Sequence, residues 1–310
     1  MDLSIIIVNY NSTVYLKDCL DSILEFTKDI IYEIIVVDNN SSDRRIEEFV
    51  NLYPKVKFVL KSTNHGFGAA CNEGFKISTG KFTCLVNPDI KIYNNIFLKF
   101  FNYLNNRQDV ICCSCLQFDN NGVLTNSFDY FPTFHSELKL IFNIGVTRHL
   151  RKLKNRTEIK EGKEFEVDYH IGAFLFLRSE GYKMIEGFDE RFFLYSEDID
   201  FGLRLKKLGK KVVCLPSERV FHYYNSTVQG LNGRIIRTIH INRSKMIYYY
   251  KHFNFLQRNI LRLFMITSVF LRLLYLPFNR VHSENRIEGV KRLLVGMKEF
   301  FRISVNHVRS

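Results

Sequence analysis

The run "LSIIIVNY", residues 3–10, is a β-rich stretch in which apolar side chains follow one another instead of alternating with polar ones. Strands buried on both faces have this pattern, and they occur in parallel sheets covered by helices on both sides. The same pattern recurs three times along the chain, and residues between these runs have helical spacing. This alternation predicts an α/β fold with a mostly parallel sheet flanked by helices. The three further strand runs are "YEIIVVDNN" (32–40), "VKFVL" (56–60) and "KFTCLV" (81–86); the expected helices span 14–26, 44–53 and 66–79.

Polar residues stand where three of these predicted strands end. They are Tyr10-Asn11, Asp38-Asn39 and Asn87-Pro88-Asp89. Ligands of open α/β sheets sit beyond the carboxyl ends of the strands, at one edge of the sheet. The three polar clusters therefore predict one binding site at that edge.

Asp38 and a small-residue stretch farther along the chain suit parts of a nucleotide ligand. A carboxylate at Asp38 can accept hydrogen bonds from a ribose or a pyrimidine N–H. The alternative is that Asp38 caps the next helix, but Ser41-Ser42-Asp43 is better placed for capping. Small residues in "NHGFGAACN" (64–72) would let backbone N–H groups approach a diphosphate at a helix start.

Asp89 is the residue of its cluster that a turn alone does not explain. Asn87-Pro88 already ends the strand, because proline fixes φ and asparagine favours turn entry. A carboxylate beside a diphosphate would recruit Mg²⁺ or Mn²⁺, which need few protein ligands. Its two interpretations, metal ligand and turn residue, stay open on this evidence.

A second cluster lies in "GFDERFFLYSEDIDFGLRL" (187–205). Ser196 is a suitable N-cap, and Glu197 and Asp198 would occupy a first helical turn, where the helix dipole favours anions. Capping does not account for five acidic residues within 189–200 beside an aromatic run. A carboxylate against an aromatic wall can act as a general base. Farther on, His222 is either structural or a metal ligand.

The remaining segments before residue 230 are less regular. We expect a strand, an Asn-Asn-Gly turn and a return strand within 109–130, and strands at 167–179 and 210–216. The charged segment 148–166 is expected to be a solvated loop.

The chain carries a net charge of +12, and its location is informative. Residues 231–310 contain 15 Lys and Arg against 3 Asp and Glu, so the rest of the chain is neutral. Such a tail suggests contact with an anionic surface. The seven cysteines lie in apolar runs, and Met1 leads directly into a strand without a signal peptide, so we expect reduced thiols and a cytoplasmic location.

The tail is predicted to be helical. Its longest uncharged run is nine residues, Leu263–Leu271, far short of the roughly 20 that a membrane span needs. On a helix, Arg258, Arg262 and Arg272 fall within an arc of about 80° beside a wide apolar face. This pattern predicts an amphipathic helix on the inner face of an anionic membrane, as in a peripheral protein. The alternative is that this wide apolar face packs against the domain formed by the first 230 residues. We therefore divide the chain into domains 1–230 and 231–310.

Taken together, the stretches quoted above resemble the inverting nucleotide-sugar glycosyltransferases of family 2, which have a GT-A fold. The resemblance covers about residues 3–230. Asn87-Pro88-Asp89, where relatives have Asp-x-Asp, and the downstream "GFDERFFLYSED" are similar to the rhamnosyltransferase branch. The chain departs from that branch at Phe201, where leucine is usual, and in segment 148–166.

The resemblance implies a role for each matching position. Asp198 would be the catalytic base, with Glu197 beside it orienting the acceptor or the loop. Asp89 would bind Mg²⁺ or Mn²⁺, and His222 would be a further metal or diphosphate contact. The donor-binding residues would be Tyr10, Asn11, Asp38, Asn39, Asn64, Gly66, Phe67, Gly68, Asn72 and Asn87.

The implied function is transfer of a sugar, with inversion, from a nucleotide-diphosphate donor to a hydroxyl of a cell-envelope or lipid-linked glycan. dTDP-rhamnose is the first choice of donor, and a UDP-hexose or UDP-N-acetylhexosamine is the alternative. A sugar-nucleotide pyrophosphorylase would need a Gly- and Arg-rich loop where this chain has 10–14, "YNSTV". A nucleic-acid-binding protein would explain the basic tail but not the acidic and amide clusters, so no nucleic acid is expected as a partner.

Overall fold

The computed structural model describes residues 1–43, 45–142, 144, 155–223, 230–275 and 283–302, and it forms two compact units. The first comprises 1–131, 151–190 and 197–225, and the second 132–150, 191–196 and 226–310. The second unit thus includes two segments from within the first 230 residues.

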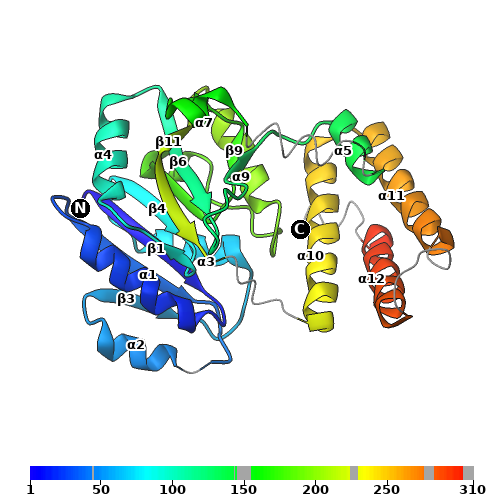
Figure 1. Cartoon of the computed structure of the whole chain (residues 1–310), viewed down its shortest axis with the longest axis horizontal. Coiled ribbons are helices and arrows are strands. Elements are labelled where there is room, and N and C mark those ends of the chain that lie inside the picture. The colour runs from blue at the N-terminus through cyan, green and yellow to red at the C-terminus, as the bar shows by residue number, and fades with distance from the viewer. Residues whose placement is uncertain (44, 143, 145–154, 224–229, 276–282, 303–310) are drawn as a thin grey trace. The chain divides into compact units, whose positions relative to one another are not determined.

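The first unit is built on a nine-stranded sheet with the order β3-β2-β1-β4-β10-β6-β11-β5, and β8 also pairs with β11 (Figure 1). The pairs among β3, β2, β1 and β4 are parallel, as is β6 with β11, whereas β10 runs antiparallel to both β4 and β6. The mixed α/β fold with a mostly parallel sheet is therefore confirmed. The strands are β1 (Leu3–Asn9), β2 (Tyr32–Asp38), β3 (Val56–Leu60), β4 (Phe82–Val86), β5 (Ile90–Lys91), β6 (Val110–Phe118), β8 (Phe165–Glu166), β10 (Phe174–Arg178) and β11 (Lys211–His222).

Successive side chains of a strand point to opposite faces of the sheet, so these apolar strands present hydrocarbon on both faces. Helices cover both of them. On β1, Leu3, Ile5 and Ile7 belong to one buried cluster, and Ile6 and Val8 to the other. The first cluster also contains residues of α1 (Thr13–Phe26), α2 (Ile46–Leu52) and α4 (Ile96–Asn106). The second contains residues of α3 (Phe67–Lys76), α8 (Ser179–Met184) and α9 (Glu197–Lys206).

Two of the expected strands are wrong in part. After β6 the Asn-Asn-Gly turn forms, but only Phe118 and Leu124 then pair, and the short β7 (Phe128–Asp129) pairs with β9 (Tyr169–His170) instead. The expected strand 167–179 is interrupted between β9 and β10, where Gly172 bonds to a side chain of α9. The strand expected at 210–216 continues to His222 as β11.

The charged segment 148–166 is more ordered than expected where it is described. Its residues 148–154 lie outside the described residues, but α7 (Thr157–Glu161) and β8 follow them. Phe165 is 7% exposed and packs in the sheet's second cluster together with Ile159. Two well-placed apolar residues are thus enough to anchor a mostly charged stretch.

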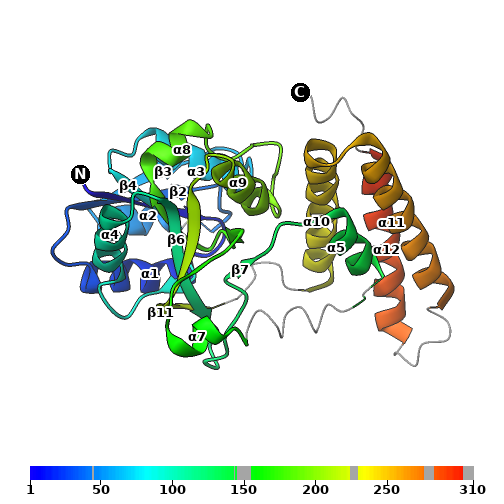
Figure 2. The ribbon, with the colours of Figure 1, turned by 90° about the horizontal axis from the view of Figure 1, so that it is seen from above.

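The second unit is helical, and Figure 2 shows its elements from above. They are α5 (Phe134–Ile141), α10 (Gly230–His252), α11 (Phe255–Tyr275) and α12 (Ser283–Arg302). Glu137 on α5 accepts from Tyr249 and pairs with Lys245 of α10 at 2.8 Å. Among the described residues, no helix is long and apolar enough to cross a membrane.

The basic stripe of α11 has an orientation opposite to the one expected. Arg258 stacks over the ring of Tyr250 on α10 at 4.5 Å, Arg262 bonds the hydroxyl of the same residue, and Arg272 donates to the carbonyl of Ile141 on α5. The stripe therefore faces neighbouring helices. Exposed apolar side chains lie on the other side of α11: Leu256 (67%), Leu263 (62%), Phe270 (60%) and Leu274 (59%).

The seven cysteines are all buried free thiols, as expected. Burial raises the pKa of each thiol, for Cys112 to about 12, so they act as apolar core residues.

Candidate functional site

Asp38, at the end of β2, lies opposite Asn9 at the end of β1. The Asn9 amide donates to the Asp38 carboxylate at 2.7 Å, and Ser41 donates to it through both its hydroxyl, at 2.6 Å, and its backbone N–H, at 2.9 Å. Asp38 is only 3% exposed, and these bonds compensate for the burial of its carboxylate. Asp38 therefore fixes the loop at this edge of the sheet. Its contact with a nucleoside stays a prediction.

Tyr10 and Asn11 follow β1 directly. The ring of Tyr10 is 42% exposed and can offer a face for stacking. Asn11 has a positive φ of 52°, which asparagine tolerates better than most residues. Its side-chain oxygen accepts from the backbone and the hydroxyl of Ser42, so Asn11 ties the β1 loop to the β2 loop.

Asn39, Asn64 and Gly66 form one hydrogen-bonded group at the start of α3. The Asn39 amide donates to the Asn64 side chain at 2.8 Å and to the Gly66 carbonyl at 3.0 Å, and the Gly66 N–H donates to Asn64. Gly66 has a φ of 96°, a conformation that favours glycine. The structure thus brings together three of the predicted donor-binding residues and joins the ends of β2 and α3.

Three other predicted donor-binding residues pack against the 187–190 loop. Asn72 uses both amide protons on the Phe188 carbonyl and Glu190, and its oxygen accepts from Tyr182 and the Phe188 N–H. A side chain on Gly68 would collide with Phe188, and the ring of Phe67 lies edge-on to it. For Asn72, direct contact with a donor would require one of these four bonds to break.

Asp89 and His222 meet although 133 positions separate them, because β5 pairs with the end of β11. His222 Nε2 is 3.2 Å from an Asp89 carboxylate oxygen, and the Tyr223 N–H donates to the Asp89 carbonyl at 2.9 Å. His222 Nδ1 is 3.0 Å from the Gln117 side-chain oxygen, which holds the imidazole in place. When Nδ1 carries the proton, the Nε2 lone pair faces the carboxylate.

This pair fits a divalent cation as a partial site. One carboxylate and one imidazole held through its other nitrogen are ordinary ligands of Mn²⁺, and a diphosphate would supply further oxygens. Among the described residues no group of three or more His, Cys, Asp or Glu converges as a metal cluster, so Asp89 and His222 are the two ligands that this part of the chain would supply.

Gly172 and Ala173, between β9 and β10, connect the two halves of the predicted site. The Gly172 N–H donates to Asp198 at 3.3 Å, and the Ala173 carbonyl accepts from the Asn87 N–H at 2.9 Å. The predicted base and the Asn87-Pro88-Asp89 turn are therefore bonded to adjacent residues of the same segment. A Cβ built on Gly172 would lie 3.6 Å from Asp198 and 3.4 Å from the Phe67 ring, so this position borders both.

Glu197 and Asp198 open α9 and differ in their surroundings. Asp198 is half-buried and accepts from Gly172 and from the Ile199 N–H at 2.9 Å. Burial raises the pKa of Asp198 to about 6, which leaves most of it ionised at neutral pH. Glu197 is 7% exposed, and one of its oxygens has no hydrogen-bond partner among the described residues. Burial, followed by the Asp198 charge, raises the pKa of Glu197 well above its ordinary value.

The backbone before this pair is strained. Tyr195 and Ser196 have φ values of 69° and 62°, which are uncommon for residues other than glycine. Two consecutive residues of this kind cost free energy that the surrounding structure must repay, and such strain concentrates at functional sites. The turn redirects the chain immediately before Glu197 and Asp198.

Three residues of the site were missed by sequence reasoning: Asn9, Gln117 and Gly172. Asn9 and Gln117 carry a weak signal, since each is a polar residue in an otherwise apolar strand run. Gly172 interrupts a strand-like run, which often marks a close backbone approach. The pairing of Gln117 with His222 is long-range and has no signal in the sequence.

Comparison with known proteins identifies the class. The Glycosyl transferase family 2 model matches residues 4–179, and the Glycosyl transferase family group 2 model matches residues 157–287. The first match spans more than half of the chain, so this protein belongs to glycosyl transferase family 2.

Two similar curated proteins are rhamnosyltransferases. The chain is 26% identical over 230 residues to rhamnosyltransferase WbbL of Escherichia coli K12, an alignment that covers 71% of this chain and 82% of the relative. It is 24% identical over 233 residues to the N-acetylglucosaminyl-diphospho-decaprenol L-rhamnosyltransferase of Mycobacterium tuberculosis (strain CDC 1551 / Oshkosh), covering 71% and 76%.

Solved structures agree with the fold. GalNAc-T7 with UDP, GalNAc and Mn²⁺ superposes with a TM-score of 0.56 at 13% identity, covering 81% of this chain and 51% of that one. Residues 1–349 of S. aureus TarS give a TM-score of 0.50 at 17% identity, covering 96% and 81%. Both neighbours are glycosyltransferases of the GT-A fold.

Proposed function

We propose that this glycosyltransferase moves a sugar from a nucleotide-diphosphate donor to an acceptor hydroxyl with inversion at the anomeric carbon. The observation that carries the proposal is the link through Gly172 and Ala173. Adjacent residues hold a carboxylate with a pKa of about 6 and the turn that presents Asp89. A general base and a diphosphate-binding carboxylate are the two groups that a single displacement needs.

In this mechanism Asp198 accepts the proton of the acceptor hydroxyl while that oxygen attacks the anomeric carbon. The new bond forms between the acceptor oxygen and the sugar, and the bond to the diphosphate oxygen breaks. The nucleoside diphosphate leaves with the electron pair. One displacement gives one inversion, so no covalent intermediate on the protein is required. A base whose pKa is near the working pH combines the ionised state with useful basicity.

The leaving diphosphate gains negative charge as the bond breaks. Asp89 and His222 would hold Mg²⁺ or, better suited to an imidazole, Mn²⁺, which when bound would stabilise that charge. Gln117 would keep the Nε2 lone pair of His222 directed to the same point. Tyr10, Asp38 and the Asn39–Asn64–Gly66 group would contact the nucleoside and ribose, and Asn87 would lie beside the diphosphate.

The proposed donor is dTDP-rhamnose, supported by the Asn87-Pro88-Asp89 sequence and by the two rhamnosyltransferase relatives. A UDP-hexose or UDP-N-acetylhexosamine is the second candidate, favoured by the UDP in the GalNAc-T7 structure and in one of TarS. The acceptor would be a hydroxyl of a cell-envelope or lipid-linked glycan. The second relative is named for a diphospho-decaprenol acceptor, which supports the lipid-linked form.

We also propose that the protein works on the cytoplasmic side of a membrane as a peripheral protein. The support comes from α11, where Leu256, Leu263, Phe270 and Leu274 fall within an arc of about 40° at 100° per residue and are all exposed. An exposed apolar stripe on a basic unit suits the surface of an anionic bilayer. The stripe, and not the inward-facing arginines, would enter the lipid.

The test combines a donor panel with one substitution. The purified protein is incubated with dTDP-rhamnose, UDP-glucose and UDP-N-acetylglucosamine in the presence of Mn²⁺, and release of nucleoside diphosphate is measured with and without a glycan acceptor. Asp198→Asn is expected to keep donor binding and to lower transfer about 100- to 10,000-fold. Full turnover by this variant would remove Asp198 from the mechanism, and a failure of every donor in the panel would count against the proposed function itself.

A further inference from the structure

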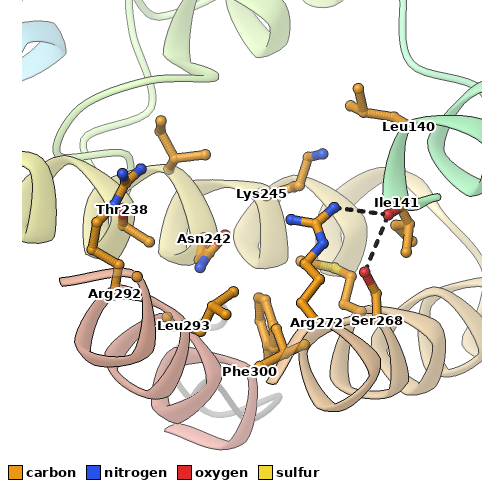
Figure 3. Close-up of a pocket in the computed structure, with 15 residues that line it drawn as sticks. Leu140, Ile141, Thr238, Asn242, Lys245, Ser268, Arg272, Arg292, Leu293 and Phe300 are labelled. Atoms are coloured by element: carbon orange, nitrogen blue, oxygen red, sulfur yellow. Dashed lines mark hydrogen bonds between the residues drawn. The ribbon is translucent and has the colours of Figure 1, made fainter. Parts of the chain in front are cut away.

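The helical unit contains a pocket that the proposed reaction does not use. It has a volume of about 430 Å³, within the range of small-molecule sites. Figure 3 shows its lining side chains, which come from the end of α5 and from α10, α11 and α12. All of these residues belong to one compact unit.

The lining combines cations with apolar side chains. Lys245, Arg272 and Arg292 supply the charge, and none of the described residues that line the pocket is acidic. The remaining lining is largely hydrocarbon, contributed mainly by Leu140, Ile141, Ile241, Met265, Val269, Leu293 and Phe300. A ligand that satisfies both kinds of surface has an anionic group joined to an apolar chain.

The cations differ in how far they are already neutralised. Lys245 pairs with Glu137 at 2.8 Å. Arg272 donates one guanidinium N–H to the Ile141 carbonyl, at 3.2 Å, and the Ser268 hydroxyl donates to the same oxygen (Figure 3). A guanidinium has five N–H donors, so Arg272 keeps others for a ligand.

Among the described side chains of its own helix, Glu288 is the acidic group on which Arg292 acts. That carboxylate is already bonded to both Nε and Nη2 of Arg234, the second at 2.9 Å. Arg234 and Arg292 both lower the pKa of Glu288, Arg234 more strongly. Arg292 therefore keeps most of its capacity to bind an anion, and guanidinium groups suit phosphoryl oxygens because they can bond two of them at once.

We propose that this pocket binds a phosphoryl group attached to an apolar chain, with the phosphoryl group at Arg272 and Arg292 and the chain along Met265, Leu293 and Phe300. None of its lining residues is among Asp89, Asp198 and the donor-binding residues, and binding there does not depend on transferase activity.

The experiment uses calorimetry on the full chain with three probes below their micelle concentrations: octyl phosphate, inorganic phosphate and octyl glucoside. Octyl phosphate is expected to bind with one-to-one stoichiometry and at least tenfold more tightly than either of the others. Equal binding of inorganic phosphate would show an ion site only, and equal binding of octyl glucoside would show an apolar surface only. Either result would overturn the proposal.

A matched pair of variants localises the binding. Arg292→Gln is expected to weaken octyl phosphate binding about tenfold, as expected from loss of a charge-assisted contact. Lys291→Gln removes the same charge from the preceding residue of α12, which does not line the pocket. This substitution is expected to change the affinity for octyl phosphate less than twofold. Equal effects of the two substitutions would contradict the assignment.

A fluorescent reporter keeps the test independent of how Arg292→Gln folds. The chain contains no tryptophan, so Leu140→Trp, at a lining position that is 42% exposed, gives tryptophan emission from the pocket alone. Octyl phosphate is expected to shift that emission to shorter wavelength at concentrations that match the calorimetric titration. An unchanged spectrum at saturation would place the ligand elsewhere.

Discussion

Glu197 and Asp198 are adjacent in sequence, but their surroundings separate their roles. Asp198 receives two backbone N–H bonds, which favour its ionised form, whereas one oxygen of Glu197 is without a partner among the described residues. Two carboxyls this close do not ionise independently, and the one with fewer hydrogen bonds keeps its proton. This arrangement leaves Asp198 as the base and Glu197 as a neutral neighbour.

Glu197→Gln tests this division through stability. The folded protein holds the Glu197 proton more strongly than the unfolded chain, so the free energy of unfolding falls as pH rises above about 4.5. Glutamine removes that dependence. The variant is therefore expected to become steadily more stable relative to the wild type as pH rises from 5 to 8, measured by urea unfolding. Glu218→Gln, at a buried carboxylate that pairs with Lys99, is the control and should show no such gain. A pH-independent difference for Glu197→Gln would contradict the assignment.

Asp89→Ala tests the proposed metal site. It removes one of two protein ligands, so the part of donor binding that depends on Mn²⁺ is expected to disappear. Calorimetry with UDP or dTDP, with and without Mn²⁺, measures this; at least tenfold enhancement by the metal is expected in the wild type. Asp109→Ala, at a surface carboxylate paired with Arg107 and Lys211, is the control. Persistence of the Mn²⁺ effect in Asp89→Ala would place the cation elsewhere.

At the residue scale, local chemistry was predictable and long-range pairing was not. Asp38, Asp89 and Asp198 stand out in the sequence because a carboxylate follows an apolar strand or an aromatic run. The partners that orient them are Asn9, His222 and Gly172, and all three are brought near by strand pairing or by a loop. The bonds from Asn9 and Ser41 to the Asp38 carboxylate were likewise not predictable from its position after a strand.

At the scale of elements, the 191–196 loop is positioned by contacts with α10. The loop belongs to the helical unit, and α10 contacts three consecutive residues of it, Phe193, Leu194 and Tyr195. The Ser244 hydroxyl donates to the Leu194 carbonyl at 2.7 Å, the Phe193 ring stacks on His240 at 4.6 Å, and Arg237 lies over the Tyr195 ring. These contacts repay the strain at Tyr195 and Ser196, and the chain continues from there directly into α9.

Ser244→Ala should therefore affect catalysis through position. Without its partner the Leu194 carbonyl loses a partly buried hydrogen bond, and the strained turn before Asp198 relaxes. We expect kcat to fall about five- to tenfold while the donor Kd changes little, because a loss of about 1–1.5 kcal/mol is typical of one such bond. Initial-rate kinetics together with donor calorimetry separate the two effects. Thr267→Ala removes an exposed hydroxyl that bonds only within α11 and is the control. A rise in donor Kd without a change in kcat would refute a positioning role.

Single strands were easier to predict than the pairs that they form. Strands β1 to β4 follow apolar runs whose bounds shifted by two residues at most, since burial on both faces dictates the composition. The hairpin after β6 was wrong because β7 pairs with β9, a choice made by tertiary packing. The periodicity of α11 gave the angular positions of its basic stripe. The direction that this stripe faces is set by Tyr250 and Ile141, which lie outside the helix and have no signal in its periodicity.

At the scale of the whole molecule, the charge is divided between two regions. Residues 231–310 carry all of the +12, and the remainder is neutral. The same region carries the exposed apolar stripe of α11. Each basic residue near an anionic bilayer contributes about 1 kcal/mol, and each buried Leu or Phe about 1.5–3 kcal/mol, so the two effects are of similar size. Binding to a membrane would therefore need both.

Flotation with lipid vesicles tests this requirement. The wild type is expected to float with vesicles that contain anionic phospholipid at 50 mM salt and to be released in part at 500 mM, because screening shortens the reach of the charges. The double variant Leu263→Glu, Phe270→Glu should remain in the lower fraction at both salt concentrations. Leu52→Glu, at an apolar residue of α2 that is 58% exposed, is the matched control and should float like the wild type. Undiminished flotation of the double variant would mean that charge alone holds the protein to lipid, and the α11 stripe would then have to be assigned to a protein partner.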